Sequence, residues 1–107
     1  MPDPYYNPEK FDLEIVECFE VNPDYDFDMF VIWRHTDGTI YVGQDSGCSC
    51  PSPFENFGSL EDLTKFSDSK SLIEEFDSWN RGYGNSLKEP AVSEAHQKIR
   101  AIFKEDQ

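Results

Sequence analysis

The sequence contains few basic residues. Lys and Arg together number 9 against 22 Asp and Glu, which gives a formal net charge of −13. The shortage is greatest in residues 1–62, where 14 acidic residues face only Lys10 and Arg34, while residues 63–107 hold 8 acidic and 7 basic residues. Such a surface repels the phosphates of bare nucleic acid, which excludes direct nucleic-acid binding. It suits a basic protein partner, a cation or plain solubility.

Long apolar runs are missing as well. No stretch approaches the roughly 18 consecutive apolar residues that a membrane-spanning helix needs. The N-terminus, MPDPYYNPEKF, has neither the basic start nor the apolar run of a secretory signal. We therefore expect no membrane contact and a cytoplasmic location. Only three cysteines occur, and in a reducing cytoplasm we expect thiols or metal ligands rather than disulfides.

Aromatic residues, in contrast, are plentiful. Nine Phe, five Tyr and two Trp make up 15% of the chain, within a hydrophobic fraction of 37%. These large side chains can fill a core, and 107 residues correspond to one domain. The prolines and adjacent tyrosines of residues 1–10 predict an extended N-terminal arm, and residues 11–107 are expected to form a single α+β domain.

The first part of that domain has the patterns of an antiparallel meander. Residues 11–21 alternate apolar and acidic side chains, and Glu17 interrupts the alternation as a bulge or an edge residue would. Residues 27–35 and 39–44 predict two further strands, joined by a two-residue turn at Asp37-Gly38. That turn would pair His35 with Ile40. The side chains expected on one face of the first strand are Phe11, Leu13, Ile15, Phe19 and Val21.

The second part has helical periodicity. Ser59 with Asp62 predicts a short capped helix that carries Leu60, Leu63 and Phe66 on one side. Ser71 with Glu74 predicts the start of a second helix, and Pro90 that of a last one. Their apolar stripes are Leu72, Ile73, Phe76 and Trp79, and Val92, Ala95, Ile99, Ile102 and Phe103. The expected fold is thus α+β, a three-stranded antiparallel meander followed by two to three helices packed on one face.

Residues 31–63 resemble a known family. The segment contains Trp33-Arg34, the loop DSGCSCPSPFE (Asp45–Glu55) and a short Leu-Glu-Asp-Leu helix at residues 60–63. In this combination it resembles a family of small uncharacterised proteins encoded by tailed bacteriophages of actinobacteria. The resemblance implies a phage protein that acts in the cytoplasm of the infected bacterium. It implies no activity.

The cysteine loop is a candidate metal site. Cys48 and Cys50 are close enough to bind one zinc ion, and Cys18 or His35 can complete a tetrahedral set. The spacing provides only one close pair, however, so packing of Cys48 and Cys50 in a proline-stiffened loop is the favoured interpretation. Nothing in the sequence orients or activates a thiol for catalysis, and we expect no enzymatic activity.

The acidic N-terminal half is a candidate for protein binding. Carboxylates at alternate positions of the first strand, and others entering the second, would concentrate negative charge at one end of the sheet. We predict a non-enzymatic protein that binds a host factor, plausibly by mimicking nucleic acid on a basic partner; the alternatives are a zinc-stabilised domain and a minor structural or self-associating phage protein. The residues expected to contact the partner are Asp12, Glu14, Asp24, Asp26, Asp28, Asp45, Phe54 and Phe57.

Overall fold

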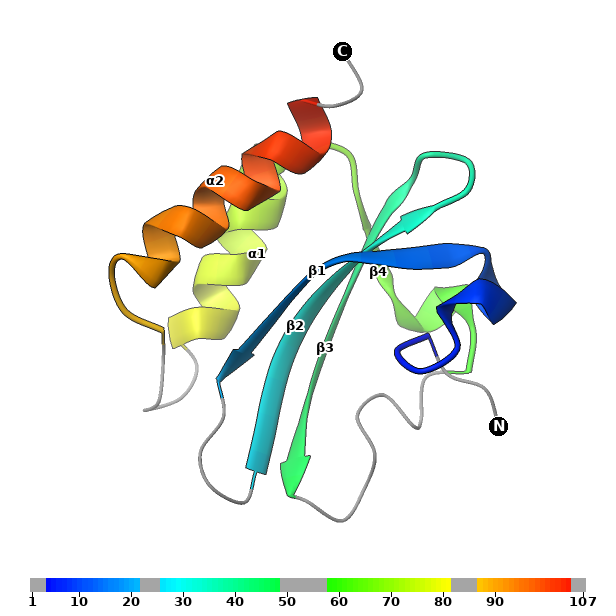
Figure 1. Ribbon diagram of the computed structural model, residues 1–107, viewed down its shortest axis with the longest axis horizontal. Helices are drawn as coiled ribbons and strands as arrows, with labels where there is room; N and C mark the ends of the chain where they lie inside the picture. The colour runs from blue at the N-terminus through cyan, green and yellow to red at the C-terminus, as the bar shows by residue number, and fades with distance from the viewer. Residues whose placement is uncertain (1–3, 22–25, 49–57, 82–86, 105–107) are drawn as a thin grey trace.

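The computed structural model describes residues 4–21, 26–48, 58–81 and 87–104 (Figure 1). Of residues 21, 26, 27, 46–48 and 104 it describes the backbone alone. In chain order the elements are η1 (Pro8–Phe11), β1 (Leu13–Val21), β2 (Asp26–His35), β3 (Ile40–Cys48), η2 (Leu60–Asp62), β4 (Thr64–Phe66), α1 (Ser69–Arg81) and α2 (Ala91–Lys104).

The strands form one antiparallel sheet in the order β1-β2-β3-β4. The predicted α+β class is confirmed, but the sheet has four strands instead of three. β2 lies between β1 and β3, and the side chains of residues 29–33 on it are at most 2% exposed. Burial on both faces explains why this strand is a continuous apolar run without alternation.

Each face of the sheet is covered by a different kind of structure (Figure 1). The two helices cover one face, here called the helix face, where Phe30 and Ile32 of β2 belong to the same core cluster as Leu72, Phe76 and Ile99. The N-terminal segment and η2 cover the opposite face, where the buried residues are Leu13, Met29, Val31, Trp33, Tyr41 and Leu63. Both faces of the sheet are therefore used to build core.

A bulge in β1 changes which face its side chains reach. The pairing with β2 shifts between Ile15 and Glu17, which leaves Val16 as the extra residue. Leu13 therefore joins the cluster on the opposite face, while Phe19 joins the helix-face cluster. The irregularity predicted at Glu17 is confirmed. The prediction that Phe11, Leu13, Ile15, Phe19 and Val21 share one face is wrong, because one inserted residue reverses the alternation.

The turn between β2 and β3 is one residue longer than predicted. The Gly38 N–H donates to the His35 carbonyl at 2.8 Å, and the His35 N–H donates to the Thr39 carbonyl at 2.8 Å. Gly38 has a φ of 94°, which its missing Cβ permits, and the three-residue loop 36–38 results. The register consequently pairs Arg34 with Ile40 rather than His35 with Ile40.

The segment after the cysteine loop does not form the predicted short helix with Leu60, Leu63 and Phe66 on one side. Ser59 and Asp62 do form the predicted capping box, but η2 ends at Asp62 and the chain extends at once into β4. Leu63 then packs on the opposite face and Phe66 on the helix face. A strand sends successive side chains to opposite faces, which is why Leu63 and Phe66 separate.

Both long helices occur where the periodicity predicts them. Leu72, Phe76 and Trp79 of α1 and Ala95, Ile99 and Ile102 of α2 are buried, as expected. The cap of α1 differs from the prediction, because Asp68 rather than Ser71 caps it: the Ser71 N–H donates to Asp68 Oδ1 at 2.7 Å. Neither helix is long and apolar enough to cross a bilayer, and no other helix in the described ranges is either.

The described part of the predicted N-terminal arm folds back onto the sheet. Pro4 is buried, and its carbonyl accepts a 2.8 Å hydrogen bond from the indole Nε1–H of the fully buried Trp33. Tyr5 and Phe11 pack on the same cluster. A buried indole N–H needs an acceptor, and the backbone of the N-terminal segment provides it.

Candidate interaction surface

The predicted acidic contacts do not gather at one end of the sheet. Glu14 pairs with Arg34 at one end of the β1–β2 hairpin, whereas Asp28 pairs with Val21 at the other end. At about 3.3 Å per residue, the seven steps along the strand from Glu14 to Val21 span roughly 23 Å. Asp12 is exposed beside Glu14, in the left-handed conformation that ends η1. The proposed concentration of charge at a single end is therefore wrong.

Two of the predicted contacts are partly buried within the fold. The Trp79 Nε1–H donates to Asp28 Oδ1 at 2.7 Å, which ties α1 to β2. Asp45 is half-buried on the inner strand β3, opposite Met29. We infer that Asp28 has a structural role. Asp26 lies in β2 with its side chain outside the description, and Asp24, Phe54 and Phe57 lie outside the described residues.

Negative charge instead follows the edge strand β1. Glu14, Glu17 and Glu20 are spaced along it, and its sequence LEIVECFEV contains no basic residue. Within the described part of the chain, β1 pairs only with β2, so its other side is an open edge. This open side of β1 with its three glutamates is called the acidic edge below. Glu17 and Glu20 were missing from the sequence-based set of contacts, because the alternation alone does not show which strand lies at the edge.

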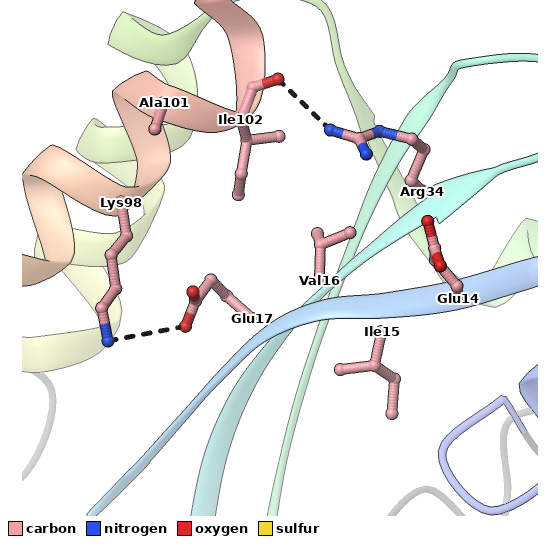
Figure 2. Close-up of a pocket in the computed structure, with 8 residues that line it drawn as sticks. All are labelled: Glu14, Ile15, Val16, Glu17, Arg34, Lys98, Ala101 and Ile102. Carbon is pink, nitrogen blue, oxygen red and sulfur yellow. Dashed lines mark hydrogen bonds and ion pairs between the residues drawn. The ribbon is translucent and has the colours of Figure 1, made fainter. Parts of the chain in front are cut away.

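A groove of about 280 Å³ runs between β1 and the C-terminal half of α2 (Figure 2). Figure 2 shows Val16 and Glu17 pointing from β1 towards α2, while Ile15 points to the other side of the strand. Ala101 and Ile102 line the helix side of the groove. The groove thus combines apolar surface with the carboxylates of the acidic edge.

Two cations border the same groove. Lys98 Nζ lies 3.9 Å from Glu17 Oε1, and 56% of the Lys98 side chain is exposed. Arg34 Nη2 donates to the Ile102 carbonyl at 3.4 Å, near the end of α2. A long, exposed ion pair contributes little stability. Lys98 therefore shields Glu17 while leaving it accessible to another cation.

The opposite side of β1 exposes apolar and sulfur-containing side chains. Ile15 is 37% exposed and Cys18 is exposed. Desolvation, followed by the carboxylates of Glu20 and Glu17, raises the pKa of the Cys18 thiol. Desolvation, followed by Cys18, Tyr6 and Glu20, likewise raises the pKa of Tyr5. A raised thiol pKa disfavours the reactive thiolate, so the surroundings of Cys18 are unlike those of a catalytic cysteine.

The candidate zinc ligands are spread along the sheet. Cys48 pairs with Asp26 at one end of β2, and His35 is the last residue at the other end. Nine residue steps along the strand separate these ends, about 30 Å, whereas zinc holds its ligands within roughly 2.3 Å of the metal. Cys18 pairs with Val31 between them, and Cys50 lies outside the described residues. His35 and Cys48 therefore do not share an ion.

Other acidic and thiol groups do not supply a metal site either, as far as the structure describes the chain. Among the described residues, no three His, Cys, Asp or Glu side chains come together in a group that can hold a metal ion. The His35 Nδ1 lies 3.2 Å from Asp37 Oδ1 at the β2–β3 turn. The His96 Nε2 lies 2.7 Å from Asp77 Oδ1 and joins α2 to α1. Both histidines thus have local structural partners.

The chain belongs to the DUF7574 family, a domain of unknown function, whose model matches residues 3–105. The match covers nearly the whole chain and includes both helices and all four strands. Comparison with curated proteins and with solved structures found no match. The family is thus one without an assigned activity, as the sequence resemblance implied, and the match itself carries no information about a phage origin.

Proposed function

We propose that the protein acts by binding another protein rather than by catalysis, with the acidic edge as its contact surface. The observation that carries the proposal is the position of β1: a nine-residue strand with three glutamates lies at an open edge of the sheet. Charges arranged along an accessible edge attract an oppositely charged surface and speed its association at low salt. The partner that fits is a basic protein.

The resemblance of residues 31–63 to proteins of actinobacterial phages suggests where such a partner occurs. In that setting the protein would act in the host cytoplasm, and a basic host factor that itself binds nucleic acid is the natural target. A net charge of −13 supports this choice of partner, because a basic groove that accepts phosphates also accepts a row of carboxylates. The same charge opposes binding of nucleic acid by the protein itself.

Self-association is the competing structural role, and the acidic edge opposes it. Two copies of β1 placed edge to edge would bring Glu14, Glu17 and Glu20 of one chain near the same residues of the other. Like charges across paired strands are destabilising. We therefore favour a different, basic protein as the partner over a second copy of this chain.

The proposal is tested by a tagged pull-down from lysate of an actinobacterial host, at low and at moderate salt. The test variant is the double charge reversal Glu14→Lys, Glu20→Lys. The control variant also carries two charge reversals, Glu74→Lys on the exposed side of α1 away from the sheet edge and Glu94→Lys on α2. Both variants thus change the net charge by the same amount. Both variants should retain the circular dichroism spectrum of the unmodified protein.

We expect one dominant protein, identified by mass spectrometry, that the unmodified protein and the control variant retain and the test variant loses. Retention should decline at moderate salt, because a Debye length of about 8 Å at 0.15 M screens exposed charges. Equal loss with both variants would show that net charge alone attracts the partner. Enrichment of no protein at either salt would overturn the proposal.

A further inference from the structure

The backbone of β1 presents a row of hydrogen-bonding groups to the open side of the sheet. The N–H and C=O of His35 both bond to the β3 side, at Thr39 and Gly38. Successive residues of an antiparallel strand direct their backbone N–H and C=O to alternate sides, so the backbone of Arg34 bonds towards β1. On β1, the residues paired with His35, Trp33, Val31 and Met29 therefore direct their backbone groups outward, away from β2. Those outward residues of β1 are Leu13, Ile15, Cys18 and Glu20.

We propose that the acidic edge receives an extended segment of the partner as a fifth strand, with lysine or arginine at the positions that face the helix side. This inference rests on the proposed function and specifies how the partner binds. Addition of a strand satisfies the outward backbone groups of β1, and alternate side chains supply specificity. The glutamates on and beside the strand select a basic segment over an acidic or neutral one.

The groove beside α2 suits the basic side chains of such a segment. A strand added at β1 projects alternate side chains to the helix side, where Glu14 and Glu17 lie and where Val16 and Ala101 line the groove. Lysine and arginine place their aliphatic stems on apolar surface while the charged head reaches a carboxylate. Lys98, only loosely paired with Glu17, is the group that competes with an incoming cation.

The other side of the added strand meets different chemistry. There Ile15, 37% exposed, offers apolar surface, and Tyr6 of the N-terminal segment is 57% exposed. Glu20 continues the negative charge at the far end of β1. A segment with basic residues alternating with apolar ones therefore matches both sides of the edge at once.

Charges and bulges also protect sheet edges against unwanted pairing, and the bulge at Val16 has this effect on β1. Protection by negative charge is selective, however. It rejects acidic edges, including that of a second copy of this chain, and attracts basic ones. The bulge divides the outward groups into two short runs, Leu13 with Ile15 and Cys18 with Glu20, so the partner strand pairs in two sections or carries a matching irregularity.

The inference is tested by amide hydrogen exchange with a synthetic nonapeptide that alternates lysine and valine. In the free protein the outward amides of Ile15, Cys18 and Glu20 should exchange rapidly, while those of Glu14 and Phe19, bonded to β2, are protected. Saturating peptide should slow the outward amides selectively. A peptide of the same sequence, N-methylated at alternate residues to remove one edge of donors, should bind more than about tenfold more weakly, because it loses several backbone hydrogen bonds at once.

Two substitutions on the protein sharpen the test. Lys98→Ala should strengthen peptide binding several-fold, because Glu17 loses its competing cation, and Arg100→Ala on the exposed surface of the same helix is the matched control that should change binding less. Glu14→Gln should weaken binding. Equal effects of Lys98→Ala and Arg100→Ala on peptide binding would show that the basic side chains of the peptide do not occupy the groove.

The outcomes separate this inference from the proposed function. Peptide binding without slower exchange at the outward amides, or with equal affinity of the N-methylated peptide, overturns strand addition while a charge-driven contact stands. Absence of binding by the lysine–valine peptide also overturns it. A pull-down without a salt-sensitive partner overturns the proposed function instead, whatever the peptide does.

Discussion

The two faces of the sheet are stabilised in different ways. The helix face is covered by regular amphipathic helices, and its cluster is almost entirely apolar. The rings of Phe30 and Phe76 each contact those of Phe19 and Trp79 and one another, at centroid distances of 5.1–6.3 Å. The opposite face is covered by irregular segments, residues 4–11 and η2, and its largest side chain is held by one buried hydrogen bond to a backbone carbonyl. Regular helices can be recognised in a sequence, whereas an irregular cover depends on contacts that form only in the fold.

The largest effect is expected from Phe76→Ala, which removes the ring at the centre of the helix-face cluster. Phe76 is 0% exposed and contacts the rings of Phe19, Phe30 and Trp79. The free energy of unfolding should fall by about 3–5 kcal/mol, the usual cost of a buried phenylalanine. Urea unfolding followed by circular dichroism measures it, with Ser78→Ala on the exposed side of α1 as the control. A cost below about 1 kcal/mol would mean that the helices contribute little to the core.

A smaller effect should distinguish the faces directly, because each carries one tryptophan that donates an indole hydrogen bond. Trp33→Phe leaves the buried Pro4 carbonyl without its 2.8 Å partner, which should cost about 1–3 kcal/mol. Trp79→Phe removes the 2.7 Å bond to Asp28, but the half-buried carboxylate can bind water instead, so we expect a cost of about 1 kcal/mol.

Amide exchange of residues 4–11 adds a second measurement to that pair of variants. These amides should exchange faster in Trp33→Phe and remain unchanged in Trp79→Phe, because only Trp33 contacts the N-terminal segment. If both variants behaved alike, the two faces would form one cooperative unit and the contrast between them would have no consequence for stability.

The smallest expected effect is a loss of stability at low pH, which arises from carboxylates at the turns and helix caps. Backbone N–H groups lower the pKa of Asp37 (from Thr39) and of Asp68 (from Ser71), and the Ser93 hydroxyl lowers that of Glu89. A carboxyl whose pKa is lower in the folded state stabilises the fold fully above its unfolded pKa of about 4. That contribution is lost as the pH falls through the folded pKa.

Thermal unfolding from pH 7 to pH 3 measures this loss. The midpoint should begin to fall near pH 4–5, and Asp68→Asn, which keeps an acceptor for the Ser71 N–H, should show a shallower fall than the unmodified protein. Asp12→Asn, which removes an exposed carboxylate that caps no helix N-terminus, is the control for the loss of one negative charge. An identical slope in all three proteins would contradict the role assigned to Asp68.

Sequence patterns predicted the elements better than the way in which they pair. Trp79 and Ile99 fell on the buried sides of their helices because a 3.6-residue period depends on local sequence alone. The predicted hairpin register was wrong by one residue because Asp37-Gly38 is compatible with turns of two and of three residues. Only the hydrogen bonds of His35 decide between the two turns. β4 was missed because three residues are too few to show any period, and their neighbour β3 stabilises them as a strand.

The candidate surface was predictable in composition and not in place. The excess of acids in residues 1–62 is visible in the sequence, and so was the choice of a basic partner that it suggests. Which acids share a surface depends on strand order and on the bulge, since Glu17 and Glu20 gained their position from β1 being outermost. Asp28 was among the predicted contacts, yet its carboxylate accepts a hydrogen bond from Trp79, 51 residues later in the chain.

The single extra residue at Val16 also limits how the length of this chain can change during evolution. Substitutions at Leu13 or Phe19 alter one core at a time. Loss of one residue between them would reverse the alternation and turn Leu13 towards the helices and away from Trp33, or force Phe19 out of the ring cluster. Insertions and deletions, which surface loops accept readily, are therefore expected to be excluded from residues 15–17, although these residues lie on an exposed edge strand.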